Sequence, residues 1–213
     1  MSRILFALLF VTTFAISTLS QTPNQPEVAP TCYLPLSQAP VIRGIRLGMK
    51  PDEWLKLFPG SAQDEKIKAI LDRPPTFPEY GFKEIIFYPA FSPSLFSYLP
   101  REEFSGIFNV SLTLFDNQII AFRIKYAAYP GIDNPWDSVE QLIPIFSETF
   151  NLPQLSAWHK NGSGAELKCA GFELILNAGN GPSAYLTSKY DFNQIIRQRA
   201  EADKQKGRAA FKP

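Results

Sequence analysis

The chain has 213 residues, 45% of them hydrophobic and 14% aromatic, so it can bury a sizeable core as one domain or as two small, closely packed ones. Its 21 Lys and Arg residues nearly balance 20 Asp and Glu residues, and this balance argues against a nucleic-acid-binding protein because no overall field favours phosphate. With one histidine and two cysteines, the side chains that usually bind zinc are too few, so we expect no metal and no cofactor.

The amino-terminal residues 1–20 have the layout of a cleavable signal peptide. Arg3 is the only charge before the apolar run 4–14, and the small residues that follow suit a cut before Gln21. An uncleaved anchor is the alternative, but a span needs about 20 apolar residues and hydroxyl side chains interrupt this run. We therefore expect an exported protein, periplasmic or extracellular, with no transmembrane segment after cleavage.

The two cysteines, Cys32 and Cys169, are predicted to form a disulfide, since an even pair in an oxidising compartment favours a bond over two free thiols. Two unpaired buried thiols are the alternative. Residues 21–40 hold five prolines and show no periodicity, which indicates an extended proline-rich arm. The bond would tie this arm to the last part of the sheet.

Residues 41–128 carry the pattern of helices followed by strands. Pro51 in a first helical turn and the stop Pro59-Gly60 favour a short helix. Asp116-Asn117 is the expected two-residue turn of the clearest hairpin. The expected elements are helices over 51–58 and 64–71 and strands over 82–88, 109–115 and 118–126.

Residues 129–190 repeat this order. A helix is expected to begin at Asp137 or Ser138 and to run towards Phe150, where Pro144 predicts a kink or an early end. The expected strands cover 166–169, 172–177 and 183–188. In 191–213 we expect a helix from Asp191 and a frayed basic tail from Glu201, because seven basic and three acidic residues lie beyond residue 188.

The predicted fold class is α+β, with short helices packed on an antiparallel sheet. The recurring order indicates two tandem helix-plus-three-strand units, 41–128 and 129–190, followed by a C-terminal helix and tail in 191–213. A single α+β domain in which the recurrence is accidental is the alternative.

A short segment carries a family resemblance. Gly44-Ile45-Arg46-Leu47-Gly48-Met49, followed by a short helix and Phe58-Pro59-Gly60, resembles the opening of small exported bacterial proteins of the BamE (SmpA/OmlA) and beta-lactamase-inhibitor-protein fold group. The resemblance implies a helix packed on a three-stranded antiparallel sheet, with two such units in tandem in the inhibitor proteins. Unlike the lipoprotein members, this sequence has no lipobox, so we expect no lipid anchor.

No pattern of catalytic residues emerges. His159 is the only histidine, no Gly-x-Ser-x-Gly motif occurs, and adjacent carboxylates such as Asp52-Glu53 suit helix starts or solvent. We therefore interpret the chain as a binding or envelope-associated protein; a secreted hydrolase with an unrecognised site and a carrier of an apolar ligand are the alternatives. A pocket joining His159 to a carboxylate and a hydroxyl would favour an enzyme, and a sheet face rimmed by aromatics would favour binding.

The segment from Tyr88 to Phe108 is the candidate binding element. It is too long for a simple connection, and its aromatic side chains suit recognition of another envelope protein or an apolar ligand. An inward fold that caps the sheet is the alternative. The candidate binding residues are Phe91, Phe96, Tyr98 and Phe104.

Overall fold

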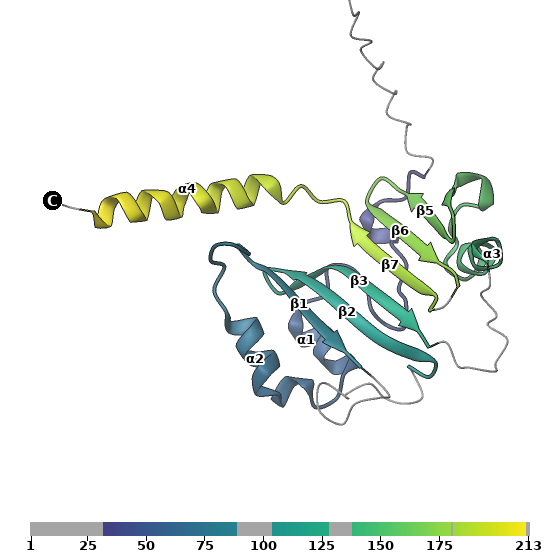
Figure 1. The fold of residues 1–213 in the computed structure, drawn as a ribbon, viewed down its shortest axis with the longest axis horizontal. Helices are drawn as coiled ribbons and strands as arrows, with labels where there is room; N and C mark the ends of the chain where they lie inside the picture. Colours follow the sequence, from purple (N-terminus) through teal and green to yellow (C-terminus); the bar gives the residue numbers. More distant parts are fainter. Residues whose placement is uncertain (1–31, 89–103, 128–137, 180, 212–213) are drawn as a thin grey trace, which may run out of the picture.

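The computed structural model describes residues 32–88, 104–127, 138–179 and 181–211, so the predicted signal peptide lies outside it. Seven antiparallel strands form one sheet in the order β1-β2-β3-β7-β6-β5-β4 (Figure 1). The strands are β1 (Phe82–Phe87), β2 (Ile107–Phe115), β3 (Gln118–Tyr126), β4 (His159–Asn161), β5 (Gly164–Lys168), β6 (Phe172–Asn177) and β7 (Ser183–Ser188). The helices are α1 (Pro51–Trp54), α2 (Glu65–Asp72), α3 (Val139–Phe150) and α4 (Asn193–Ala210).

The α+β class is confirmed, and in both halves helices precede antiparallel strands as predicted. The sheet, however, is larger than expected. Strands β3 and β7 pair from Ala121 with Thr187 to Lys125 with Ser183, which joins the strands of both halves into one sheet. The short strand β4 adds a seventh member that the sequence did not predict.

Local side-chain contacts explain where the first helices begin. The Glu53 carboxylate accepts a hydrogen bond from the Lys50 amide at 2.9 Å, at the start of α1. The Asp64 carboxylate accepts from two amides in the first turn of α2, one of them that of Lys66 at 2.8 Å. Such caps satisfy amides that have no partner within the helix.

One face of the sheet forms the hydrophobic core, and α1, α2 and α3 contribute side chains to it. Trp54 from α1 and the following Phe58 pack on Phe87 of β1, with the Phe58 and Phe87 rings stacked at 4.0 Å. Leu142 and Ile143 of α3 are buried in the same cluster. Alternate strand residues supply the other wall, because successive side chains of a strand point to opposite faces.

The arm is fastened to the body by the Cys32–Cys169 disulfide, which confirms the predicted pairing. Next to it, the Gly171 amide donates to the Leu34 carbonyl at 3.0 Å. A Cβ at Gly171 would lie 2.0 Å from the Leu36 amide nitrogen, so only glycine allows the arm to approach this closely.

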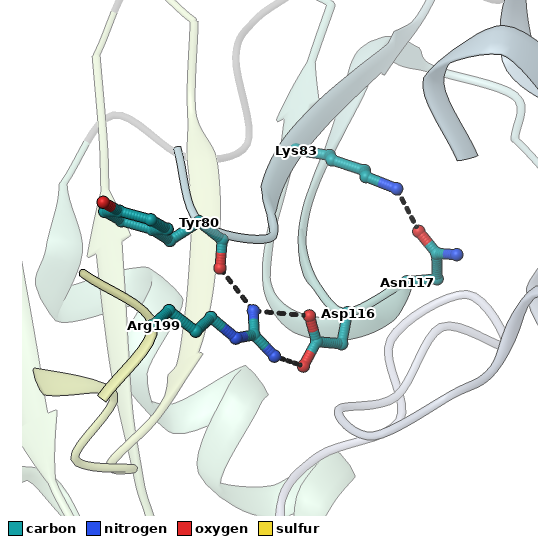
Figure 2. A network of polar contacts seen from close by, with 5 residues as sticks. All are labelled: Tyr80, Lys83, Asp116, Asn117 and Arg199. Atoms are coloured by element: carbon teal, nitrogen blue, oxygen red, sulfur yellow. Dashed lines mark hydrogen bonds and ion pairs between the residues drawn. The ribbon is translucent and has the colours of Figure 1, made fainter. Parts of the chain in front are cut away.

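The hairpin between β2 and β3 closes through Asp116 and Asn117, with φ angles of 49° and 68°, as a two-residue turn requires. Figure 2 shows that this turn also anchors other elements. Arg199 of α4 donates to both Asp116 carboxylate oxygens, at 2.9 and 2.6 Å, and to the Tyr80 carbonyl. Lys83 donates to the Asn117 side chain at 2.8 Å and to a carbonyl at the end of α2.

The structure corrects the expected end of the last helix and decides part of the expectation at Pro144. The segment after Glu201 is not frayed: α4 continues to Ala210, projects from the body and is exposed from residue 201 onward (Figure 1). Of the two outcomes predicted at Pro144, an early end does not occur, because α3 runs from Val139 to Phe150 with Pro144 inside it; the kink stays a prediction. Within the described ranges, no helix has the length and apolar character needed to cross a membrane.

Candidate functional site

Of the four predicted binding residues, the structure places one. Phe104 is only 2% exposed, and its ring centroid lies 5.7 Å from that of Phe58 in the core. For Phe104 the alternative interpretation therefore holds: its side chain folds inward and packs in the core. Phe91, Phe96 and Tyr98 lie outside the described residues.

The sheet face opposite the core carries a row of side chains that crosses all seven strands; we call it the open face. Each residue of the row is the direct cross-strand partner of the next, and each is half-buried or exposed. From β1 to β4 the row consists of Ile86, Ser111, Arg123, Tyr185, Ile175, Glu166 and His159. An antiparallel sheet commonly keeps one such face in contact with water.

An aromatic and basic group lies in the middle of the open face. The Arg123 guanidinium is 4.9 Å from the centre of the Tyr185 ring, a cation–π contact. Two residues along β3, the Lys125 ammonium is 5.3 Å from the Phe108 ring, which meets the Tyr88 ring edge-on at 6.2 Å. Sequence analysis missed Arg123 and Tyr185 because each occupies an ordinary solvent-facing position in a strand whose side chains alternate between core and solvent.

A pair of carboxyl groups occupies the part of the open face formed by β5 and β6. The hydrogen bond that the Glu173 carboxyl group donates to Glu166, together with burial, raises the pKa of Glu173 to about 7. The same hydrogen bond lowers the pKa of Glu166. Two close carboxyl groups cannot both ionise easily, so Glu173 holds the proton and donates it to the ionised Glu166. Lys168, at 2.9 Å from Glu166, supplies a neighbouring positive charge.

A shallow hollow of about 220 Å³ adjoins the carboxyl pair. It brings His159 next to Glu166, its cross-strand partner, together with the amide side chains of Asn161 and Asn177. Its lining contains no hydroxyl or thiol, so the hollow does not have the third group of a Ser-, Thr- or Cys-type catalytic site. Both cysteines are in the disulfide. Among the described residues, no cluster of three or more His, Cys, Asp or Glu side chains is arranged to hold a metal ion.

The carboxyl pair predicts how stability depends on pH. Below its ordinary pKa of 4.5, Glu173 is protonated whether the chain is folded or unfolded. Between pH 4.5 and about 7 the unfolded chain releases this proton and the folded protein retains it, so folding becomes less favourable as pH rises. We expect Glu173→Gln, which cannot titrate, to gain stability over the wild type across this window.

Urea unfolding at several pH values from 4.5 to 7.5 measures this difference. The lowered pKa of Glu166 places its titration below the window, so it does not mask the effect. Glu84→Gln, at an exposed position of β1, controls for the loss of one carboxylate. If the free energy of unfolding of Glu173→Gln changed with pH in parallel with that of the wild type, Glu173 would not retain its proton in the folded protein.

No protein-family model, no curated protein sequence and no solved structure matches this chain. The resemblance to the BamE and beta-lactamase-inhibitor-protein group therefore stays a prediction.

Proposed function

We propose that this chain is an exported, non-enzymatic binding protein that recognises another protein of the cell envelope through its open face. Export is supported by the signal-peptide pattern of residues 1–20 and by the Cys32–Cys169 disulfide, which suits an oxidising compartment.

The observation that carries the binding proposal is the uninterrupted row across seven strands, with Arg123 and Tyr185 at its centre. Arg and Tyr are among the side chains that contribute most to protein–protein affinity when a partner covers them. Strands β3 and β7 are each paired with a neighbouring strand on both sides, which holds the backbone at these two residues in place. Little conformational entropy is therefore lost when a partner binds.

The charges of the open face indicate how a partner would orient. Arg123 and Lys125 make the middle basic, whereas Glu173 on β6 and Glu166 on β5, two and three strands away from β3, provide a carboxylate with a shared proton. A partner that places an acidic group over β3 and a hydrogen-bond donor over β5 would match this pattern, and complementarity of this kind favours one orientation.

The proposal predicts that Arg123→Glu abolishes recognition. We expect the mature protein to capture a partner from an envelope extract, and the variant to bind that purified partner at least about a hundredfold more weakly, because a central contact is replaced by a like charge. Mass spectrometry identifies the captured partner, and calorimetry with both purified proteins measures the affinity.

Lys206→Glu is the matched control, since it makes the same charge reversal at an exposed position of α4. Tyr185→Ala provides a second test in which charge is unchanged. A partner that binds wild type, Arg123→Glu and Tyr185→Ala with equal affinity would refute recognition through the open face.

A further inference from the structure

The turn between β4 and β5 lies at one end of the sheet, since β4 is the last strand in the order. Asn161 ends β4 and is paired with Gly164, the first residue of β5, so Gly162 and Ser163 form a two-residue turn. Gly162 has a φ of 59°, as the first position of a tight hairpin turn requires. Asn161, Gly162 and Ser163 are all exposed, so solvent reaches the turn.

Two groups of this turn can react with each other: the side-chain carbonyl carbon of Asn161 and the backbone nitrogen of Gly162. Neither the Asn161 side chain nor the Gly162 amide makes a hydrogen bond to the described residues. A Cβ built at Gly162 would meet no atom within 4 Å, so no other part of the described chain crowds this residue. Attack of the nitrogen on the carbonyl carbon closes a five-membered ring, and an intramolecular reaction is fast when its two groups can meet.

A second asparagine that lines the same hollow provides a contrast, because both of its reacting groups are held. The Asn177 side chain donates a hydrogen bond to the Ser183 hydroxyl at 3.3 Å. The amide that follows it, that of Ala178, donates to the Ser163 carbonyl at 2.8 Å. Ala178 also carries a methyl group, which hinders attack. Asn177 should therefore react much more slowly than Asn161.

The sequence contains another Asn-Gly step, Asn180-Gly181, and the structure distinguishes it from the first. The Gly181 amide donates a hydrogen bond to the Gly179 carbonyl at 2.7 Å, which holds the attacking nitrogen in place. Asn180 itself lies outside the described residues. The free amide of Gly162 thus favours Asn161 as the more reactive of the two.

The attack also requires Asn161 to leave its strand conformation, because its backbone is paired with Gly164. Strand β4 has only three residues, all exposed, and within the described sheet it pairs with β5 alone. Short exposed elements at an edge open locally at a small cost in free energy. Opening of β4 can therefore precede the attack while the rest of the sheet stays folded.

We propose that Asn161 is a site of spontaneous deamidation. The Gly162 nitrogen bonds to the side-chain carbonyl carbon of Asn161, the bond from that carbon to the side-chain nitrogen breaks, and ammonia leaves with the proton of the Gly162 amide. Water then opens the cyclic imide at one of its two carbonyl carbons. Opening at the side-chain carbon gives aspartate, and opening at the backbone carbon gives isoaspartate, in which the chain runs through the former side chain.

Either product changes the open face at its β4 end. A carboxylate at position 161 adds a negative charge to the hollow that already contains Glu166, and isoaspartate also inserts one backbone atom before Gly162. The extra atom shifts the pairing with Gly164 that ends β4. The reaction needs no partner, so it is independent of recognition through the open face.

Incubation of the full mature chain in mildly alkaline buffer tests the proposal, because deprotonation of the amide speeds the attack. After reduction, cleavage after lysine in mildly acidic buffer releases residues 161–168, in which Asn161 is the only amide side chain, and residues 169–189, which hold Asn177 and Asn180. Mass spectrometry should show a gain of one mass unit in the first peptide, divided between two chromatographic products. We expect conversion at Asn161 to be at least about tenfold faster than at Asn177.

Asn161→Gln should lose the mass change in residues 161–168, because the larger ring forms far more slowly. Asn177→Gln is the matched control and should convert at Asn161 as the wild type does. Incubation in urea separates the effect of the structure from that of the sequence: unfolding should remove the advantage of Asn161 over Asn180, since both precede glycine. Absence of conversion at Asn161 in the folded protein, or conversion no faster there than at Asn177 or Asn180, would overturn the proposal.

Discussion

Replacing both cysteines, in C32A/C169A, is expected to lower the free energy of unfolding by about 5 kcal/mol. The bond joins residues 137 positions apart, so it closes a loop through most of the folded chain. A cross-link stabilises chiefly by restricting the unfolded chain, and the restriction grows with loop length. Because domains are commonly stable by only about 5 to 15 kcal/mol, this loss should be visible as a large shift of the urea midpoint.

Wild-type protein unfolded in the presence of dithiothreitol is the matched control for the double variant. Reduction removes the same covalent constraint without removing either side chain, so both samples should show similar midpoints. Single variants at Cys32 and Cys169 should match each other and the double variant, because each breaks the same bond. A double variant within about 1 kcal/mol of the oxidised wild type would mean that the bond does not constrain the unfolded chain.

The elements that sequence analysis located well are those defined by local patterns. Strands β3, β6 and β7 have the predicted bounds, since alternating apolar residues and a nearby turn mark both ends of each strand. Strand β4 was missed because its three residues are all exposed, which leaves no alternation to detect. Pairing of β3 with β7 joins distant segments, and no local pattern specifies it.

The end of α4 shows how a pattern can be weighed wrongly. Its exposed residues carry charges that indicated a solvated tail, yet Ala, Lys, Arg, Gln and Glu are strong helix formers and the helix continues to Ala210.

The candidate site could not be predicted for a different reason. Arg123 and Tyr185 become neighbours only through the register of β3 and β7, so neither stretch of sequence alone could identify the pair.

Phe104→Ala is expected to lower the free energy of unfolding by about 3 to 5 kcal/mol, the usual cost of truncating a buried phenylalanine. Its ring contacts Phe58, which in turn stacks on Phe87 and meets Trp54 edge-on. Removing the ring would leave a cavity between α1 and the strands, and the surrounding aromatic side chains could only partly fill it. Urea unfolding followed by tryptophan fluorescence would report the change, because Trp54 lies in the same cluster.

Phe108→Ala is the matched control, four residues further along the chain. Phe108 is 36% exposed, so the same truncation removes less buried surface and should cost no more than about half as much. The comparison distinguishes the two interpretations of Phe104. Truncating a core residue lowers the free energy of unfolding, whereas truncating a recognition residue weakens partner binding and leaves that free energy nearly unchanged. Equal, small losses in Phe104→Ala and Phe108→Ala would contradict the burial of Phe104 and return it to the candidate binding residues.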